Sequence, residues 1–337
     1  MSGLVSVVIP NLNKKELLQS CLQSLAAQDY PDMEIIVVDN GSTDGAPDMV
    51  GDEFPDVRLI RFDWNRGFSA AVNAGIDASS GRLVALINND ADADLRWLSE
   101  LVAASERHPD AGFFASKILL YSDKQTIDTF GDGFTAAGFG YKRGWGEASE
   151  KYGKEEGVFG ACGGAAMYRM SMLRDIIVHG EYFDKDFFAY GEDLDLSLRA
   201  NLFGYRCIAV PSAVVYHRMR ATGGRGAELP LFLSHRNFML AVMKNFPAVL
   251  ILKNLFNIAC FLLLAAAVDV LQNRRLLYPR SYLAALKMWP AMKEKRRMIQ
   301  SAKRVNASSF SQLLTGGWFF LWLKLGRMSR LVREKNL

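Results

Sequence analysis

Strand-like apolar runs alternate with helix-like segments through the first part of the chain, and this alternation constrains the fold more than any other feature. Strands are predicted at Val5–Pro10, Glu34–Asp39, Val57–Phe62 and Arg82–Asn88. Helices are predicted between and after them, at Lys14–Gln28, Thr43–Phe54 (capped by Ser42 or Thr43), Gly67–Ser79 and Leu95–Arg107. Strands that alternate with helices predict an α/β fold in which a mostly parallel sheet carries helices on both faces.

Each predicted strand is followed by a short polar segment. These segments are Pro10–Asn13, Asp39–Ser42, Asn65–Phe68 and Asn88–Asp90. Any one of them alone fits an ordinary polar turn equally well. Because ligands of open α/β sheets bind outside the carboxyl ends of the strands, the four segments together predict one ligand-binding crevice.

The stretch LVALINNDAD, from Leu83 to Asp92, ends a buried strand in crowded polar side chains. Asn88 and Asp90 are two positions apart, so both are expected to point into the crevice while Asn89 points away. Their oxygen atoms suit Mg²⁺ or Mn²⁺, which keep positions open for phosphate oxygens. A metal held there would neutralise the charge of a leaving diphosphate.

The middle of the chain gives weaker patterns. The glycine-rich region Lys117–Gly160 predicts long loops and irregular strands, and GFGYKRG (Gly138–Gly144) lacks the spacing of a nucleotide-binding glycine loop. Phe187–Tyr205 predicts a helix that opens with Gly191-Glu192-Asp193. Acidic residues also suit a helix N-terminus electrostatically, so helix capping is a second explanation for them.

The C-terminal third changes character. The uninterrupted apolar run Ile258–Val268 has 11 residues, whereas a membrane span needs roughly 20, so an interfacial or buried helix is expected. Leu313–Arg333 mixes Trp, Phe and Leu with Arg and Lys, which favours a helix lying in a membrane surface over one packed on the rest of the protein.

Charge is distributed unevenly along the chain. Leu271–Leu337 holds 15 Lys and Arg against two Glu, a net charge of +13, so the total of +4 leaves −9 for the preceding residues. Such a basic tail favours an anionic partner, either a membrane surface or nucleic acid. The aromatic residues of the tail lie in a leucine-rich segment rather than being spread along it, which favours lipid over nucleic acid.

The N-terminus and the cysteines indicate the compartment. MSGLVSVVIP lacks the basic start and longer apolar region of a secretory signal. No two of the cysteines show CxxC spacing, so neither a zinc site nor a redox motif is predicted: they are Cys21, Cys162, Cys207 and Cys260. A reducing, cytoplasmic location is expected.

Six motifs occur in an order that resembles a known family. They are VSVVIPNLN, IIVVDNGSTDGA, NRGFSAAVNAGI, LINNDAD, GEDLDLSLRANLFGY and VYH. The chain resembles family 2 glycosyltransferases with the GT-A fold, and within them the rhamnosyltransferase-like bacterial enzymes of cell-surface polysaccharide and lipopolysaccharide assembly. The resemblance covers about Leu4 to His217 and implies a GT-A domain at residues 1–225. Residues 226–337 would then form a helical, basic, membrane-associated region.

The resemblance implies roles for the donor-binding residues. Asp39 would accept a hydrogen bond from the imide N–H of uracil or thymine. Asp90 would bind the metal and the diphosphate as the second acid of a DxD motif, with Asn88 replacing the first acid, and His217 would be a further metal ligand. The other expected donor-site residues are Pro10, Asn11 and Asn13 for the nucleotide and Asn65, Arg66, Gly67 and Phe68 for the sugar-phosphate portion.

The resemblance also implies the catalytic group. Asp193 would be the base that takes the proton of the acceptor hydroxyl in an inverting transfer, through an oxocarbenium-like transition state. Glu192 would support it, and Asp195 would be structural. Gly163 and Gly164 would let the backbone approach the donor sugar or acceptor closely.

The expected function is therefore metal-dependent, inverting transfer of a sugar from a dTDP- or UDP-linked donor. Rhamnose from dTDP-rhamnose is the first expectation, with a polyprenyl-diphosphate-linked glycan as acceptor at the cytoplasmic face of the bacterial inner membrane. A UDP-hexose or UDP-galactofuranose donor is the alternative within the same fold. A non-catalytic nucleotide-sugar-binding membrane scaffold is the alternative outside enzymes.

Overall fold

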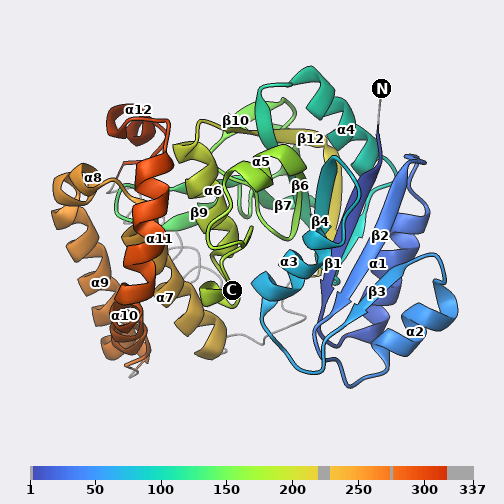
Figure 1. The fold of residues 1–337 in the computed structure, drawn as a ribbon, viewed down its shortest axis with the longest axis horizontal. Coiled ribbons are helices and arrows are strands. Elements are labelled where there is room, and N and C mark those ends of the chain that lie inside the picture. Colours follow the sequence, from blue (N-terminus) through green and yellow to red (C-terminus); the bar gives the residue numbers. More distant parts are fainter. Residues whose placement is uncertain (1–2, 219–227, 274–275, 317–337) are drawn as a thin grey trace, which may run out of the picture.

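A ten-stranded mixed sheet forms the centre of the computed structural model, which describes residues 3–218, 228–273 and 276–316 (Figure 1). The strands follow the order β10-β12-β6-β11-β4-β1-β2-β3, with β5 paired to β12 and β7 to β6. The first four strands are mutually parallel, as predicted: β1 Val5–Asn11, β2 Met33–Asp39, β3 Arg58–Arg61 and β4 Leu83–Ile87. Four predicted helices are also confirmed: α1 Lys15–Ala26, α2 Ala46–Glu53, α3 Phe68–Asp77 and α4 Trp97–Arg107.

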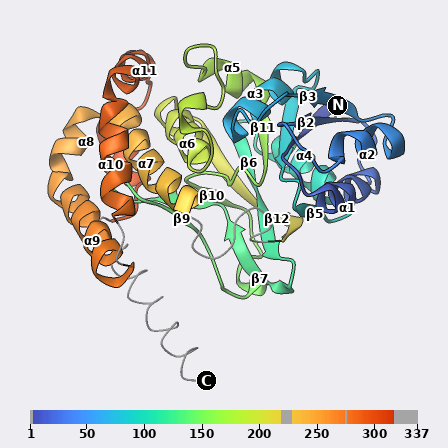
Figure 2. The same ribbon diagram turned by 90° about the horizontal axis from the view of Figure 1, so that it is seen from below.

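The residues of β1 are apolar on both sides because each face of the sheet is covered. Val7 and Ile9 belong to the core beneath α1, α2 and α4, whereas Val8 belongs to the core beneath α3 and α6 (Glu192–Leu202). β1 starts at the top of Figure 1, so the carboxyl ends of the parallel strands face the viewer in Figure 2.

The second half of the sheet departs from the predictions. β11 is antiparallel to both β4 and β6, so the whole sheet is mixed rather than mostly parallel. Residues 117–160, expected as long loops and irregular strands, contain regular strands. Of these, β7 pairs with β6 and β10 with β12, while β8 and β9 pair with each other in a separate two-stranded sheet. The remaining strands are β5 Ala91–Ala93, β6 Ala111–Leu120, β7 Asp123–Phe130, β8 Asp132–Phe134, β9 Gly140–Lys142, β10 Glu156–Val158, β11 Ala165–Arg169 and β12 Arg206–His217.

The prediction that Ser42 or Thr43 caps α2 was wrong. The residue before the helix is Gly45, with a φ of 79°, and Ser42 and Thr43 lie outside it. They are used elsewhere: Ser42 Oγ accepts from the Asn13 N–H at 2.7 Å, and the Thr43 N–H donates to Asn13 Oδ1 at 2.9 Å.

A helical layer forms the left-hand part of Figure 1. Its helices are α7 Glu228–Asn245, α8 Ala248–Lys253, α9 Leu255–Asn273, α10 Leu277–Lys287, α11 Trp289–Ala302 and α12 Ala307–Gln312. The short helix α5, Met170–Asp175, lies outside this layer in the sequence and precedes α6. Phe246 and Phe310 of this layer pack edge-on against Phe134 and Phe159, so the core continues across the predicted boundary.

Two predictions about the C-terminal region fall on residues that the structure leaves undescribed. The boundary between 225 and 226 lies in the gap at 219–227, and most of Leu313–Arg333 lies outside the described residues. Within the described ranges, no helix combines the length and apolar character needed to cross a membrane.

Candidate active site

The carboxyl ends of β1, β2 and β4 meet in a network of amides and carboxylates. Asn11 Nδ2 donates to Asp39 Oδ1 at 2.9 Å, and the Ser42 N–H donates to Asp39 Oδ2 at 3.0 Å. Asn89 Nδ2 donates to Asn11 Oδ1 at 2.6 Å and to the carbonyl of Asn13 at 3.2 Å. The predicted nucleotide-site residues are thus brought together, and Pro10 is buried beside them within β1.

The side chain of Asn89 does not point where strand alternation predicted. It was expected to point away from the crevice, but it is 8% exposed and bonded to Asn11 and Asn13. The alternation fails because β4 ends at Ile87, so residues 88–90 are already a turn.

The segment after β3 is fixed by Asn40. Asn40 Nδ2 donates to Asn65 Oδ1 at 2.9 Å, and its Oδ1 accepts from the Arg66 N–H at 2.7 Å. The Arg66 guanidinium lies over the ring of Trp64, 4.5 Å from its centroid. Gly67 has a φ of 90°, and a Cβ there would lie 2.6 Å from the Phe188 ring. The close packing at Gly67 requires glycine and holds this segment against Phe188, in the loop before α6.

Asp90 and His217 are neighbours, as the resemblance implied. His217 Nε2 lies 3.3 Å from Asp90 Oδ1, and His217 Nδ1 is 2.9 Å from Asp128 Oδ2. Lys142 Nζ in turn contacts Asp128 Oδ1 at 2.7 Å. Burial disfavours the charged imidazolium, but the carboxylates of Asp128 and Asp90 outweigh it and raise the pKa of His217 to about 9. Asp128 therefore fixes which imidazole nitrogen faces Asp90.

The oxygen atoms aimed at the crevice fit a divalent cation. Oδ1 of Asn88 is buried and receives no hydrogen bond from the described residues, and the buried Oδ1 of Asp90 lies 3.3 Å from His217 Nε2. Buried polar atoms without partners are rare in proteins unless something unseen satisfies them. One amide oxygen, one carboxylate and the His217 imidazole, which gives up its proton when it binds a metal, form a donor set that suits Mn²⁺ or Mg²⁺.

Asp193 lies at the first turn of α6, where backbone groups hold its carboxylate. Its Oδ2 accepts from the Gly163 N–H at 2.9 Å and its Oδ1 from the Leu194 N–H at 2.8 Å. Burial raises the pKa of Asp193, and these hydrogen bonds oppose the shift. The carbonyl of Gly164, the residue after Gly163, accepts a hydrogen bond from the Asn88 N–H at 2.9 Å. The two consecutive glycines therefore connect Asp193 to the segment that carries the side-chain oxygens of Asn88 and Asp90.

Glu192 is the other acid that opens α6. Its side chain is buried, and its Oε2 has no hydrogen-bond partner among the described residues. Burial, followed by the charge of Asp193, raises the pKa of Glu192 well above its usual range. This shift favours the neutral form of Glu192, whereas the backbone hydrogen bonds to Asp193 favour its carboxylate form.

A second carboxyl group lies beside Asp193. Ligand atoms of Asp132, Cys162 and Asp193 all lie within 4.8 Å of one another. Burial and the neighbouring charge of Asp193 raise the pKa of Asp132 to about 8. Burial also raises the pKa of the Cys162 thiol. Asp132 is thus protonated near neutral pH, and the cluster carries one negative charge rather than several.

The chain before α6 adopts an unusual backbone that C-terminal helix α7 stabilises. Phe188 and Tyr190 have φ values of 64° and 69°, which side chains with a Cβ rarely adopt. Asn237 Nδ2, on α7, donates to the carbonyls of Phe187, Ala189 and Tyr190 at 2.8, 2.9 and 2.6 Å. Asn237 therefore determines how α6 presents Asp193.

Asp195 is structural, in agreement with its predicted role. Its Oδ2 accepts from Arg199 Nε at 3.0 Å and from Lys244 Nζ at 2.9 Å, all fully buried. Lys244 also contacts Asp184 at 2.6 Å, and Lys295 of α11 contacts the same Asp184 carboxylate. This network joins α6 to α7 and α11.

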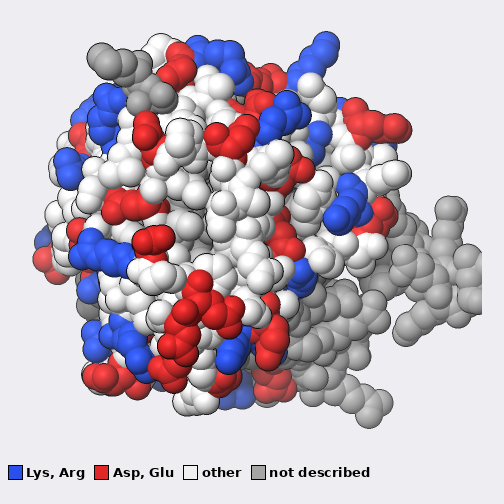
Figure 3. Space-filling model, turned by 90° about the vertical axis from the view of Figure 1, so that its right-hand side faces the viewer, with Lys and Arg blue, Asp and Glu red and all other residues white. Residues whose placement is uncertain are grey.

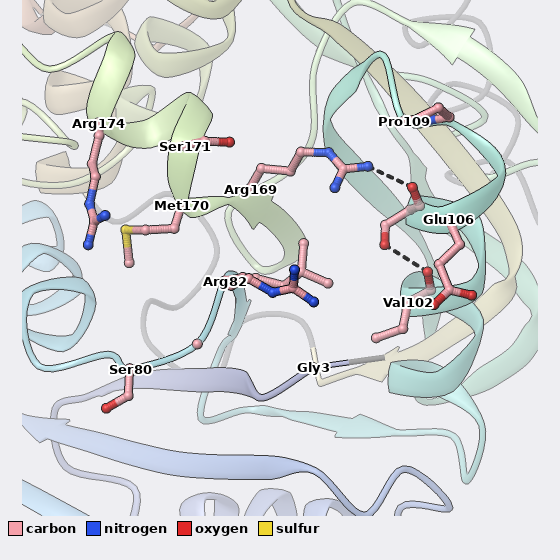
Figure 4. Close-up of a pocket in the computed structure, with 13 residues that line it drawn as sticks. Gly3, Ser80, Arg82, Val102, Glu106, Pro109, Arg169, Met170, Ser171 and Arg174 are labelled. Atoms are coloured by element: carbon pink, nitrogen blue, oxygen red, sulfur yellow. Dashed lines mark hydrogen bonds between the residues drawn. The ribbon is translucent and has the colours of Figure 1, made fainter. Parts of the chain in front are cut away.

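A separate cavity of about 520 Å³ lies at the opposite edge of the sheet, near the amino ends of β1 and β4 (Figure 4). Its lining includes Arg82, Arg169 and Arg174. The Arg169 side chain donates to the carbonyls of Ser105 and Ala111 at 2.6 and 2.7 Å. Because Arg169 is occupied in supporting α4 and β6, this cavity is not the candidate active site.

Three residues that contact the site were missed from the sequence: Asp128, Asp132 and Lys142. All lie in the region expected as long loops and irregular strands. Asp128 and Asp132 stand four positions apart in IDTFGDG, and this even spacing was the available signal that a strand would turn both carboxylates to one side.

The comparisons with known proteins agree with this geometry. The family model described as glycosyl transferase family 2 matches residues 6–177, just over half of the chain. The chain is 28% identical to the O-antigen biosynthesis protein RfbC of Myxococcus xanthus, over 65% of this chain and 17% of that protein. It is 27% identical to the N-acetylglucosaminyl-diphospho-decaprenol L-rhamnosyltransferase of Mycobacterium tuberculosis, over 70% of this chain and 83% of that protein.

Several of these relatives are much longer than the matched region. The chain spans only 17% of RfbC and 34% of the glycosyltransferase AglE of Haloferax volcanii. Among solved structures, the mannosyltransferase PcManGT of Pyrobaculum calidifontis, in complex with GDP-Man and Mn²⁺, matches with a TM-score of 0.52 and 21% identity. That match covers 88% of this chain and 85% of the other.

A second solved structure has the same fold. S. aureus TarS 1-349, in complex with UDP, matches with a TM-score of 0.56 at 16% identity, covering 91% of this chain and 90% of that one. The chain belongs to glycosyl transferase family 2.

Proposed function

We propose that this glycosyltransferase transfers rhamnose from dTDP-rhamnose, with inversion, to a polyprenyl-diphosphate-linked saccharide. The observation that carries the proposal is the Asp193 carboxylate, held by two backbone N–H groups and joined through Gly163 and Gly164 to the segment that carries Asn88 and Asp90. This arrangement supports a proton acceptor close to the oxygens proposed to hold the metal and the diphosphate.

The donor and acceptor classes rest on the relatives. The Mycobacterium protein is named as a rhamnosyltransferase that acts on a decaprenol-linked sugar, and it matches over most of its length. The solved neighbours hold UDP or GDP-Man, so the fold accommodates nucleotide diphosphates. Asp39 keeps acceptor capacity beyond the hydrogen bonds from Asn11 and Ser42, as recognition of a pyrimidine imide N–H requires.

The residues of the chain divide the chemistry between them. Asn88, Asp90 and His217 would hold Mg²⁺ or Mn²⁺, which supplies charge stabilisation for the departing diphosphate. Asp193 accepts the proton from the acceptor hydroxyl while that oxygen bonds to the anomeric carbon and the bond to the diphosphate breaks. Glu192, in its favoured neutral form, adds no charge that would oppose this transfer.

The acceptor also implies a location. A polyprenyl-linked substrate lies in a membrane, so we propose that the protein works as a peripheral enzyme at the cytoplasmic face of the bacterial inner membrane. The sequence of the basic C-terminal tail supports contact with anionic lipid.

The test compares the wild type with Asp193→Asn across dTDP-rhamnose, UDP-hexoses and UDP-galactofuranose, using Mg²⁺ or Mn²⁺ and a lipid-diphosphate-GlcNAc acceptor. We expect turnover with dTDP-rhamnose, reduced about 10²- to 10⁴-fold in the variant because general-base catalysis contributes that much. Donor affinity, measured by calorimetry, is expected to stay within about twofold because the substitution removes no donor contact.

Asp56→Asn, an exposed acid before β3, is the matched control and is expected to behave as wild type. Turnover of a UDP-linked sugar instead would correct the donor while keeping the base. Full activity of Asp193→Asn would refute the assignment of the base.

A further inference from the structure

Exposed apolar side chains concentrate on the outer surface of α8, α9 and α10. Of the 22 large apolar side chains exposed in the described part of the chain, 12 lie within residues 249–289. Three on α9 are among the most exposed: Phe256 at 68%, Leu263 at 70% and Leu271 at 79%. We call the following set the α8–α10 face: Val249, Leu252, Leu255, Phe256, Leu263, Leu264, Val270, Leu271, Leu276, Leu283, Leu286 and Trp289.

The other side of α9 packs against the protein. Phe261 and Ala265 are 6% and 1% exposed, and the Phe261 ring lies 5.2 Å from that of Phe139. Asp269, the acid within α9, is 1% exposed and accepts from the Tyr278 N–H at 2.9 Å. The inward side thus fixes the orientation of α9, and the side chains on its outer side are apolar and exposed. Contiguous apolar patches of this kind mark interaction sites.

Cations border this face. Lys253, Arg280 and Lys287 are exposed on α8 and α10, and Lys293 and Arg297 follow on α11. In the described residues from 249 to 302, Glu294 is the one exposed acid. An apolar surface bordered by Lys and Arg is the pattern of helices that lie in the interface of an anionic membrane.

We propose that the α8–α10 face inserts into the surface layer of a membrane containing anionic phospholipid, with α9 lying in the membrane plane. The 19 residues of α9 would extend about 28 Å along that plane. This proposal rests on the peripheral location proposed above, and it assigns lipid contact to residues outside the basic tail.

Charge favours lipid over the other possible occupants. A second copy would bring the same cations against this border. Residues 317–337 of this chain carry five Lys and Arg against one Glu in their sequence, so they offer no complementary charge. Anionic lipid supplies both the apolar phase and the opposite charge. The far side of the molecule, which carries α1 and α2, shows scattered charges of both signs instead (Figure 3).

The test is flotation of the full-length chain with vesicles of phosphatidylcholine and phosphatidylglycerol. The variant Phe256→Gln/Leu263→Gln/Leu271→Gln is expected to lower the partition coefficient at least tenfold, because it removes the deepest apolar contacts. The control Leu95→Gln/Ile177→Gln changes exposed apolar residues on other elements and is expected to float like the wild type. Lys253→Gln, Arg280→Gln and Lys287→Gln are each expected to weaken binding about fivefold, and only to anionic vesicles.

Three outcomes would overturn the inference. In one, the triple variant floats as well as the wild type. In another, the wild type does not float but forms a dimer that the triple variant abolishes, which makes the face a contact between copies. In the third, the wild type floats only after removal of residues 317–337, which shows that this segment covers the face.

Transfer to a water-soluble acceptor, measured on the same proteins, separates this inference from the proposed function. Flotation that depends on the face, without transfer from any donor, supports the lipid contact and refutes the proposed reaction. Transfer without flotation supports the proposed reaction and refutes the lipid contact.

Discussion

Asp132 and Asp193 share one buried corner of the active site, and their environments push them into different protonation states. Asp193 is held by the N–H groups of Gly163 and Leu194, which favour its ionised form. Asp132 is 6% exposed, and the burial and the nearby Asp193 charge raise its pKa to about 8. Two carboxyl groups this close ionise together only at high cost. The site thus keeps one carboxylate and one neutral acid at working pH.

The Asp132→Asn variant tests this division. The pKa of Asp132 is about 8 in the folded protein against an ordinary 3.8, so the folded state binds the extra proton between these values. The stability of the wild type therefore falls relative to the variant as pH rises from about 4 to about 8. Urea denaturation at pH 5 and pH 9 measures it, and a stability difference that does not change with pH would contradict the assignment.

Single residues differ in how far the sequence predicts them. Asn11, Asp39, Asp90, Asp193 and His217 were predicted because each follows a predicted strand or lies in a recognisable motif. Asp128 and Asp132 were missed because the glycines of residues 117–160 weaken the strand pattern there, and glycine inside a strand gives little local signal.

At the scale of elements, α6 and the loop before it form the unit that presents Asp193, the proposed catalytic base. The helix was predictable from its apolar spacing and its acidic start. The left-handed residues Phe188 and Tyr190 were not, because nothing local favours a positive φ in aromatic residues. Asn237, far along the sequence on α7, holds the carbonyls of this loop.

Asn237→Ala is expected to lower kcat about tenfold or more while donor affinity stays within twofold. The variant leaves three carbonyls without a donor, and a shift of the base by about 1 Å can cost 10²-fold in rate. The matched control is Asn254→Ala, whose side chain donates to the Leu250 carbonyl on α8. Loss of thermal stability with unchanged kcat would show that Asn237 is structural only. The measurement combines steady-state kinetics, donor calorimetry and thermal melting.

At the scale of the whole molecule, the catalytic sheet and the C-terminal helices share a core. The sequence predicted two parts with a boundary near residue 225, and the structure adds the packing between the described residues on either side of it. Buried ion pairs between Asp195, Lys244, Asp184 and Lys295 cross this boundary. Such pairs cannot be predicted from sequence because Lys and Asp are ordinarily surface residues. We propose that the two parts fold together.

The variant Lys244→Met, at the centre of the ion-pair network, tests whether the two parts fold together. The lysine is fully buried, and its loss leaves Asp184 and Asp195 each short of a compensating charge. We expect the free energy of unfolding to fall by about 3–5 kcal/mol. Lys293→Met, exposed on α11, is expected to change it by less than about 0.5 kcal/mol.

If the two parts fold together, the wild type is expected to unfold in a single transition in guanidinium, monitored by two probes. Two separate transitions would show independent domains.

The charges of this network also limit how the chain can be recombined with others. Asp184 and Asp195 lie in one part of the sequence, and Lys244 and Lys295 in the other. A chimera that takes its sugar-transferring part from one relative and its C-terminal helices from another inherits only one sign of charge at the join, unless both parents carry the pairs. Exchange of the C-terminal helices between relatives is therefore restricted to parents with matching buried ions, a stricter condition than similarity of the two surfaces.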